Sequence, residues 1–197
     1  MTTARDICVR AFRELRMYPA GEPVPAEHMA QALDALNGLV ASWHNKGLLI
    51  FYPPGKTWVG DWKVNTTYNV NDAVARNGNT YYCTAAVISA MNDQPGVSPN
   101  WSSYWTLYAE TPMSLDSTFF LDASHERGVS ALLALELQPA FGAELSPLTI
   151  EKAKDGMNAL YGAFFHVPTA SVDAGIVRMP SQIWPYQIPS VASSGST

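Results

Sequence analysis

The chain begins with a segment whose apolar residues recur every three or four positions, the spacing of one face of an α-helix. Between residues 3 and 17 these positions are Ala4, Ile7, Cys8, Ala11, Phe12 and Leu15. The same helical rotation places four basic residues together on the opposite side, which we call the basic stripe: Arg5, Arg10, Arg13 and Arg16. The stripe is either a solvated helix face or a surface for an acidic partner or for phosphates, including those of DNA.

A second helical pattern runs from about residue 26 to residue 46, after a connector with several prolines. Pro25 suits the start of this helix, and Gly47 suits a left-handed residue just beyond its end. Its apolar seam consists of Met29, Leu33, Leu36, Val40 and Trp43. The short apolar run at residues 48–52 predicts a strand, which Pro53-Pro54-Gly55 ends.

The pattern changes between residues 57 and 109, where helical spacing is lost and Asn, Thr, Tyr and Trp predominate. Asn77-Gly78 predicts a tight hairpin, because both residue types tolerate the left-handed backbone that a two-residue turn requires. Runs that favour strands lie on both sides of this dipeptide. The segment therefore predicts a small module of a few short strands.

Helical spacing returns at residue 122, where Asp122 or Ser124 can cap a helix that ends at Gln138-Pro139. Ser146-Pro147 predicts the start of a last helix, which closes before Val167-Pro168. The tail from residue 169 has no periodicity, but it contains more apolar residues than a flexible linker that contacts no partner. It predicts an extended arm that docks on a partner.

Together these patterns predict a mainly α protein. Residues 1–54 and 111–168 each supply two amphipathic helices, and neither pair can bury its apolar stripes alone, so we expect one discontinuous, four-helix bundle-like core. Residues 55–110 are then a small all-β insertion between the second and third helices. Residues 169–197 are the extended C-terminal arm.

Composition narrows the function classes. Charged residues make up 15% of the chain, against roughly 25% in an ordinary soluble domain, which suggests that surface is hidden in an assembly. The net charge of -5 argues against a dedicated nucleic-acid binder. Because the chain has no long apolar run and no signal-like start, we expect neither a transmembrane helix nor secretion.

The candidate chemistry is sparse. Cys8 and Cys83 are too few for a disulfide framework or a zinc site of four cysteines, and we expect both to be buried thiols. His125-Glu126 resembles the start of a zinc-protease motif, but Val129 stands where the second histidine is required. The acidic residues of the third segment show no spacing that brings carboxylates together. We therefore expect no enzyme, no catalytic residue, no metal and no cofactor, and a hydrolase is the least favoured function.

The helical segments carry a resemblance to a known family. The motifs are residues 6–15 (DICVRAFREL), 32–43 (ALDALNGLVASW), 131–137 (ALLALEL) and Phe141-Gly142. Their order resembles the head-to-tail adaptor proteins of tailed bacteriophages, also called packaged-DNA stabilisation or head-completion proteins. The resemblance covers both helical portions and the tail. It is diffuse, because it consists of the helix lengths and of a Leu-Asn pair that is followed at a fixed spacing by Trp.

This resemblance implies a virion structural protein that is assembled in the host cytoplasm and located in the neck, between the capsid portal and the tail. Its homo-oligomeric ring, a dodecamer below the portal, would extend the DNA channel, help retain packaged DNA and connect to a tail or nozzle protein. DNA would pass without sequence-specific contact, and no membrane is involved. The arm would bind the portal protein through Met179, Trp184 and Tyr186.

A second resemblance covers about residues 58–108. Residues 62–74 (WKVNTTYNVNDAV) precede the Asn-Gly hairpin, residues 79–83 (NTYYC) follow it, and residues 105–108 (WTLY) close the segment. This arrangement is similar to the small carbohydrate-binding module of bacterial chitinases, except that Asn71 stands where that family usually has glycine, so a turn is in doubt.

Surface aromatic residues of that family stack on sugar rings. The resemblance therefore implies a glycan partner and four candidate carbohydrate-binding residues, which are Trp62, Tyr68, Tyr104 and Trp105. The alternative is that these side chains form the core, because so small a module uses most of its aromatic residues there. The module would then contact protein rather than host-surface glycan.

Overall fold

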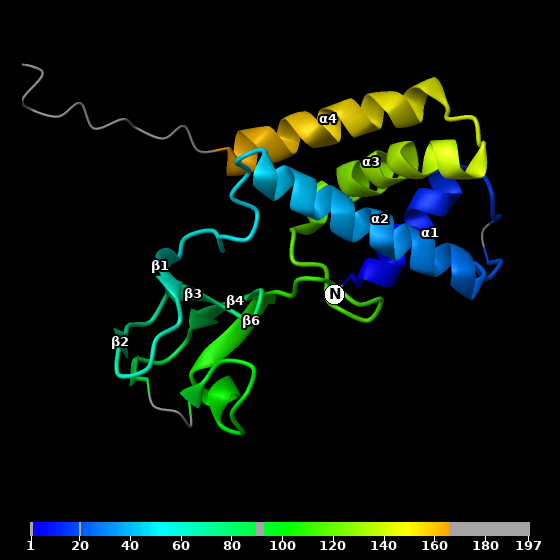
Figure 1. The fold of residues 1–197 in the computed structure, drawn as a ribbon. Coiled ribbons are helices and arrows are strands. Elements are labelled where there is room, and N and C mark those ends of the chain that lie inside the picture. Colours follow the sequence, from blue (N-terminus) through cyan, green and yellow to red (C-terminus); the bar gives the residue numbers. More distant parts are fainter. Residues whose placement is uncertain (1, 20, 90–92, 166–197) are drawn as a thin grey trace, which may run out of the picture. The chain divides into compact units, whose positions relative to one another are not determined.

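The structure is a computed structural model that describes residues 2–19, 21–89 and 93–165. Its elements are α1 (Ala4–Glu14), α2 (Ala26–Asn45), β1 (Thr57–Asp61), β2 (Thr67–Tyr68), β3 (Asp72–Arg76), β4 (Asn79–Cys83), β5 (Val87–Ile88), η2 (Trp101–Ser103), β6 (Trp105–Ala109), α3 (Ala123–Phe141) and α4 (Pro147–Phe164). The predicted fold class, mainly α with a small β insertion, is confirmed (Figure 1). The predicted arm, with Met179, Trp184 and Tyr186, lies outside the described residues.

The four helices, which we call the helical body, share one hydrophobic core. α3 contacts each of the other three helices, and α4 runs along α3 (Figure 1). Every helix contributes apolar residues to the core, and the fully buried ones include Phe12, Leu36, Trp43, Leu133 and Leu160. Residues of both helical portions therefore bury their apolar stripes in the same core.

Local capping explains where α1 and α4 begin. The hydroxyl of Thr3 accepts a hydrogen bond from the backbone N–H of Asp6, whose carboxylate accepts one from the N–H of Thr3. At α4, the Ser146 hydroxyl accepts a hydrogen bond from the Thr149 N–H at 3.1 Å. Each cap satisfies backbone donors that the first helical turn leaves unpaired.

Two predicted boundaries were wrong. Residues 48–52 do not form a strand. Their backbone makes an isolated β-bridge between Leu48 and Phe165 and no extended pairing. Leu48 and Ile50 are instead fully buried in the helical core, so this apolar run serves packing rather than a sheet. α3 continues past Pro139 to Phe141 and ends at Gly142, whose φ of 61° is left-handed.

α3 and α4 approach very closely at two glycines. A Cβ built on Gly128 would lie 2.5 Å from the Gly156 Cα, and a Cβ built on Gly156 would lie 2.4 Å from the Gly128 Cα. Both distances are far below van der Waals contact, and the atoms involved belong to the backbone. The absence of a side chain at these positions therefore sets the spacing of the two helices.

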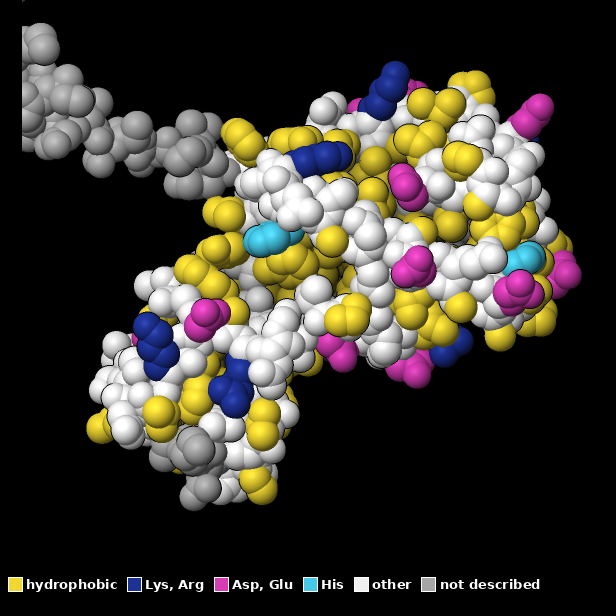
Figure 2. Space-filling model, viewed as in Figure 1, with side chains coloured by type: hydrophobic (Ala, Val, Ile, Leu, Met, Phe, Trp, Pro, Cys, Tyr) yellow, Lys and Arg dark blue, Asp and Glu magenta, His cyan; other side chains and the backbone are white. Residues whose placement is uncertain are grey.

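α4 leaves much of its surface uncovered. It buries only Thr149, Ala153 and Leu160, whereas Leu148 and Tyr161 are 60% and 37% exposed. On the face drawn in Figure 2, hydrophobic side chains are exposed over the helices, with charged side chains scattered between them. Apolar surface of this kind marks a helix that the rest of the described chain does not fully cover.

Residues 57–109, which we call the β module, contain a four-stranded sheet in the order β1-β3-β4-β6 and a small sheet that pairs β2 with β5. β1 runs parallel to β3, and the other neighbours are antiparallel. Asn77 and Gly78 have φ values of 50° and 81° and join β3 to β4, which confirms the predicted hairpin.

The turn around Asn71 is retained despite the absence of glycine. Asn71 adopts a φ of 78°, a left-handed conformation that asparagine tolerates better than most other residues. Its side-chain oxygen accepts a hydrogen bond from the Lys56 ammonium at 2.6 Å, and its N–H donates to the Cys83 carbonyl at 2.9 Å. The substitution therefore leaves the left-handed turn in place.

Candidate functional site

Two of the four aromatic residues predicted to bind sugar are buried in the core of the β module. Tyr68 and Trp105 are each 1% exposed, and their rings meet edge to face with centroids 5.1 Å apart. The Tyr68 hydroxyl also accepts a hydrogen bond from the Lys63 N–H at 2.8 Å. The burial of both rings favours the core alternative for these two residues.

Trp62 and Tyr104 are partly buried against the same core. The Arg76 guanidinium lies over the Trp62 ring, 4.6 Å from its centroid, and donates a hydrogen bond to Gln94 at 2.9 Å. One face of the Trp62 ring is thus already covered by a cation–π contact. The structure brings the four residues together around one core rather than in an exposed row.

A groove runs beside β6 and has a volume of about 430 Å³. Its lining combines partly buried aromatic rings and an exposed leucine with hydroxyl and carboxylate groups, and it consists of Trp101, Ser102, Trp105, Thr106, Leu107, Tyr108, Glu110 and Thr118. Of the four predicted residues only Trp105 reaches this groove. We call this feature the β6 groove.

The sequence reasoning did not select Trp101, Leu107 or Tyr108. Trp101 lies on η2, and its ring packs edge to face on Tyr81 with centroids 5.5 Å apart. A usable signal was present, because binding residues lie disproportionately on loops and Trp101 lies in the connection before the closing strand. The sequence around Leu107 gave no comparable indication, because the exposure of Leu107 depends on which residues cover the edge strand β6.

The polar groups of the β6 groove are held in place. The Ser117 hydroxyl donates a hydrogen bond to the Glu110 carboxylate. The Tyr108 hydroxyl is directed to the Ile50 carbonyl, 3.5 Å away. Burial, with a smaller effect from the Asp122 charge, raises the pKa of Tyr108 to about 12, so the phenol stays neutral at physiological pH. The groove therefore offers fixed polar groups next to aromatic and aliphatic surface, as small-ligand sites commonly do.

Comparison with known families identifies this part of the chain. Residues 61–106 match the model of carbohydrate-binding module family 5/12. The match confirms the resemblance seen in the sequence, so the β module contains a carbohydrate-binding-module-like domain. No curated protein matches the chain.

The matched range and the β6 groove overlap in part. Trp101, Ser102, Trp105 and Thr106 belong to the carbohydrate-binding-module-like domain, whereas the remaining lining residues follow it in the chain. The family is a non-catalytic binding module, and the match gives no information on the helical body. The groove is therefore the candidate functional site of the domain.

The structure divides the basic stripe of α1. Arg5 forms an ion pair with Asp116 at 3.0 Å, and Arg10 forms one with Glu126 at 2.5 Å. Arg13 and Arg16 have no acidic partner within residues 2–19, 21–89 and 93–165. Half of the stripe therefore stabilises the contacts of α1 with residues 111–168, the second helical portion.

The buried thiols are confirmed. Cys8 and Cys83 are both buried and unpaired. Burial raises the pKa of Cys8 to about 12, so its thiol stays protonated and unreactive at neutral pH. In the part of the chain that the structure describes, no three His, Cys, Asp or Glu side chains gather as metal ligands. The helices described there are also too short or too polar to cross a membrane.

Proposed function

We propose that the β module binds carbohydrate in the β6 groove. The observation that carries this proposal is the family match over residues 61–106, which ends in the strand that lines the groove. Sugar rings present flat C–H faces that pack on aromatic rings, while their hydroxyls require polar partners close by. Trp101 and Leu107 supply the apolar surface, and Glu110 and Thr106 supply polar groups.

Substituting Trp101→Ala is expected to lower retention of the full chain on insoluble chitin or peptidoglycan by about tenfold, equivalent to about 1.4 kcal/mol. The loss follows from removing a partly exposed aromatic ring that lines the groove. A depletion assay over a range of glycan concentrations measures it. Ile88→Ala is the matched control, because Ile88 is an exposed apolar residue of the same module outside the groove.

A second variant separates binding from folding, because Trp101 also packs on Tyr81. Leu107→Glu places a carboxylate in the groove at a position that is 41% exposed, so it changes the groove without opening the core. We expect it to reduce retention while the thermal transition stays unchanged. Retention equal to that of the unsubstituted chain in both variants, or no retention of that chain on any glycan, contradicts the proposal.

For the whole protein we propose the role of a head-to-tail adaptor in the neck of a tailed phage virion. The specific observation in favour is the uncovered surface of α4, where Leu148, Ile150 and Tyr161 are exposed, and of Phe165 directly after it. An assembly that buries these side chains removes the cost of leaving them in water. The partners would be copies of the chain in a dodecameric ring, the portal protein and a tail or nozzle protein, with packaged DNA in the channel.

The adaptor role predicts that the full chain forms rings on a portal. Native mass spectrometry of the chain with and without a purified portal ring should show a complex with one protomer for each portal subunit. Leu148→Glu combined with Ile150→Glu should abolish the complex if α4 supplies the contact, and Val59→Glu, an exposed apolar residue of the β module, should leave it intact. A chain that stays monomeric beside the portal contradicts the role.

A further inference from the structure

The four-stranded sheet of the β module has two faces with different side chains. Successive residues of a strand point to opposite faces, and residues paired across neighbouring strands share a face. One face carries the buried core around Trp105. The opposite face, which we call the outer face, carries Trp58 on β1, Ala73 on β3 and Tyr82 on β4, which the register of the sheet aligns in one row.

The outer face presents aromatic rings that the core around Trp105 does not use. Trp58 and Tyr82 are partly buried, and neither belongs to that core. Tyr52 packs on Trp58 with ring centroids 4.4 Å apart and planes inclined by 47°. The row therefore places an aromatic side chain on each side of the small Ala73, and C–H faces of sugar rings pack on aromatic surface of this kind.

A lysine ammonium is held beside these rings. The Lys56 ammonium lies over the Tyr82 ring, 4.7 Å from its centroid, and donates a hydrogen bond to the Asn71 side-chain oxygen at 2.6 Å. Because Tyr82 points to the outer face, this contact places the ammonium there as well. The cation–π contact and the hydrogen bond together restrict a side chain that is otherwise flexible.

The charge of Lys56 is not balanced by a carboxylate. Its two partners, an amide oxygen and an aromatic ring, are uncharged. Among the residues that the structure describes, no Asp or Glu lies at ion-pair distance from Lys56. The carboxylate of Asp72, which follows Asn71, accepts a hydrogen bond from the Asn69 N–H at 2.8 Å. An ammonium has three N–H donors, so Lys56 can donate to a ligand as well as to Asn71.

We propose that the outer face binds an acidic glycan, one whose sugar units carry carboxylates, as uronic acids do. Trp58 packs against a sugar ring, and Lys56 donates a hydrogen bond to its carboxylate. A uronic acid joins a C–H face and a carboxylate in one ring, which matches an aromatic ring beside a fixed ammonium. A neutral glycan leaves the charge of Lys56 without a partner.

The proposal rests on the proposed carbohydrate-binding function of the β module, but it assigns that function to other residues. Lys56 and Trp58 precede residues 61–106, so the family match covers neither of them. The β6 groove reaches the outer face at Thr106, which pairs with Tyr82. Variants of Lys56 and Trp58 leave the tested groove residues unchanged, so the two sites are tested separately.

The test compares two ligands that differ in charge. Short oligomers of galacturonic acid and their methyl esters share the same sugar rings, but esterification removes the carboxylate charge. Binding of each ligand to the full chain is measured by isothermal titration calorimetry at low and at high salt. The variants are Lys56→Gln, which removes the charge, Lys56→Arg, which keeps it, and Trp58→Ala.

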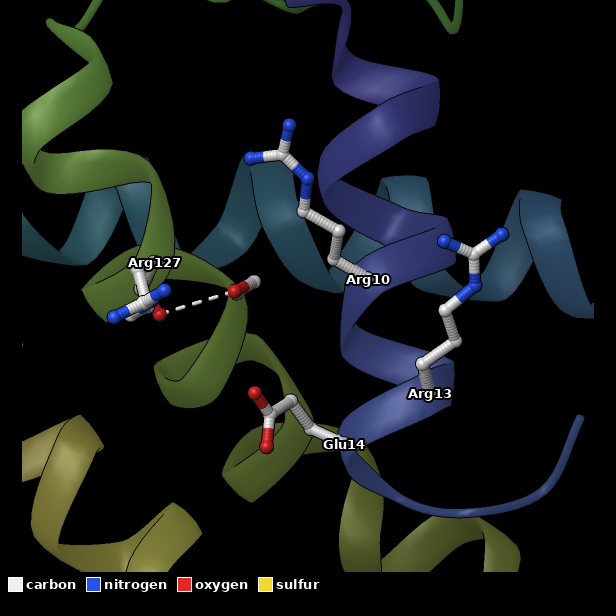
Figure 3. A pocket seen from close by; sticks show the side chains of 5 residues that line it. Arg10, Arg13, Glu14 and Arg127 are labelled. Carbon is white, nitrogen blue, oxygen red and sulfur yellow. Dashed lines mark hydrogen bonds between the residues drawn. The ribbon is translucent and has the colours of Figure 1, made fainter. Parts of the chain in front are cut away.

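Two control variants remove one exposed positive charge elsewhere. Lys63→Gln lies in the same module, in the loop between β1 and β2. Arg13→Gln lies in the helical body, where Figure 3 shows the Arg13 side chain on the side of α1 away from Arg127, so the two guanidinium groups do not face one space. These variants measure the general attraction between a basic side chain and an anionic ligand.

We expect the unsubstituted chain to bind the acidic oligomer about fivefold more tightly than its methyl ester at low salt, and high salt to remove most of this difference. Lys56→Gln should abolish the difference, whereas Lys56→Arg and the two controls should change the affinity by less than about twofold. Trp58→Ala should weaken binding of both ligands, because the ring contact does not depend on charge.

Three results overturn the proposal. They are equal affinity of the two ligands for the unsubstituted chain, no binding of either ligand, and equal losses in Lys56→Gln and Lys63→Gln. A polyglutamate peptide is a further probe, because equally tight binding of this peptide with the same dependence on Lys56 would identify a protein contact and contradict the glycan proposal.

The outcome is distinguishable from failure of the β6 groove as a glycan site. Loss of chitin retention in Trp101→Ala with unchanged binding of the acidic oligomer supports both sites. If the unsubstituted chain binds the acidic oligomer but is not retained on chitin, only the outer face stands. Thermal unfolding of each variant reports whether the module is intact, and Lys56→Gln changes no residue of its core, so the test does not depend on the Trp58 variant.

Discussion

Substitution of Gly156 by alanine is expected to lower the free energy of unfolding by about 3 kcal/mol, near the upper end for overpacked sites. The new Cβ would lie 2.4 Å from the Gly128 Cα and 2.9 Å from its carbonyl carbon. These are backbone atoms of a neighbouring helix, so relief requires α3 and α4 to separate along their length. Separation would open the core around Leu133 and Leu160.

The same helix provides a matched control. Gly162 also lies in α4, and a Cβ built on it meets nothing within 4 Å. Gly162→Ala should therefore raise stability by up to about 1 kcal/mol, because alanine loses less conformational entropy in a helix. Denaturant unfolding followed by far-ultraviolet circular dichroism measures both variants. Equal changes in the two would show that helix propensity, rather than the close approach of α3 and α4, determines the result.

Trp105→Ala is the second large effect, and we expect it to unfold the β module. Removing a large buried aromatic side chain costs about 4 kcal/mol. Among the described residues, the core around Trp105 has four other buried members, which are Tyr68, Val74, Tyr81 and Cys83. A core of this size has little stability to lose, because small domains bury a smaller fraction of their surface.

Hydrogen exchange measures this outcome residue by residue. In the Trp105→Ala chain, the amides of β3, β4 and β6 should lose protection, whereas those of α3 and α4 should keep it because they belong to a different core. Leu107→Ala, on the same strand but exposed, is the control. Full protection of β4 in the Trp105 variant would mean that the core tolerates the cavity.

Loss of glycan binding in the Trp105→Ala variant would not identify Trp105 as a sugar contact. A Trp105 variant that no longer binds chitin would report unfolding of the domain rather than the removal of a sugar contact. Trp101 and Leu107 are the informative positions, because they line the β6 groove without being buried. Because Trp105 is buried, the test of glycan binding uses Trp101 and Leu107 in place of Trp105, the residue that the sequence resemblance selected.

The helices and the hairpin were predictable because their signals are local. The spacing of Ile7, Ala11 and Phe12 and the cap at Ser146 act within a few residues, and the structure shows the helices that they predict. Asn77-Gly78 needs only its own backbone preferences to form the turn. The motif spacing of residues 58–108 also identified the carbohydrate-binding-module-like domain that the family match confirms.

The errors arose where a distant partner decided the outcome. An apolar run such as residues 48–52 becomes a strand only if a sheet edge is available, and here Leu48 and Ile50 meet the helical core instead. Pro139 can remain in the last turn of α3 because the buried face at Leu137 holds that end of the helix against its neighbours. Neither partner is visible in the local pattern.

The sequence by itself determined the helical periodicity, the turn chemistry, the likeness of the β module to a carbohydrate-binding family and the existence of a basic face on α1. Only the tertiary structure decided which aromatic rings are core and which arginines form ion pairs. The physical reason is that burial and ion pairing depend on contacts across the chain. Arg10 is neutralised by Glu126, more than a hundred positions away, whereas Arg13 has no acidic partner among the residues that the structure describes.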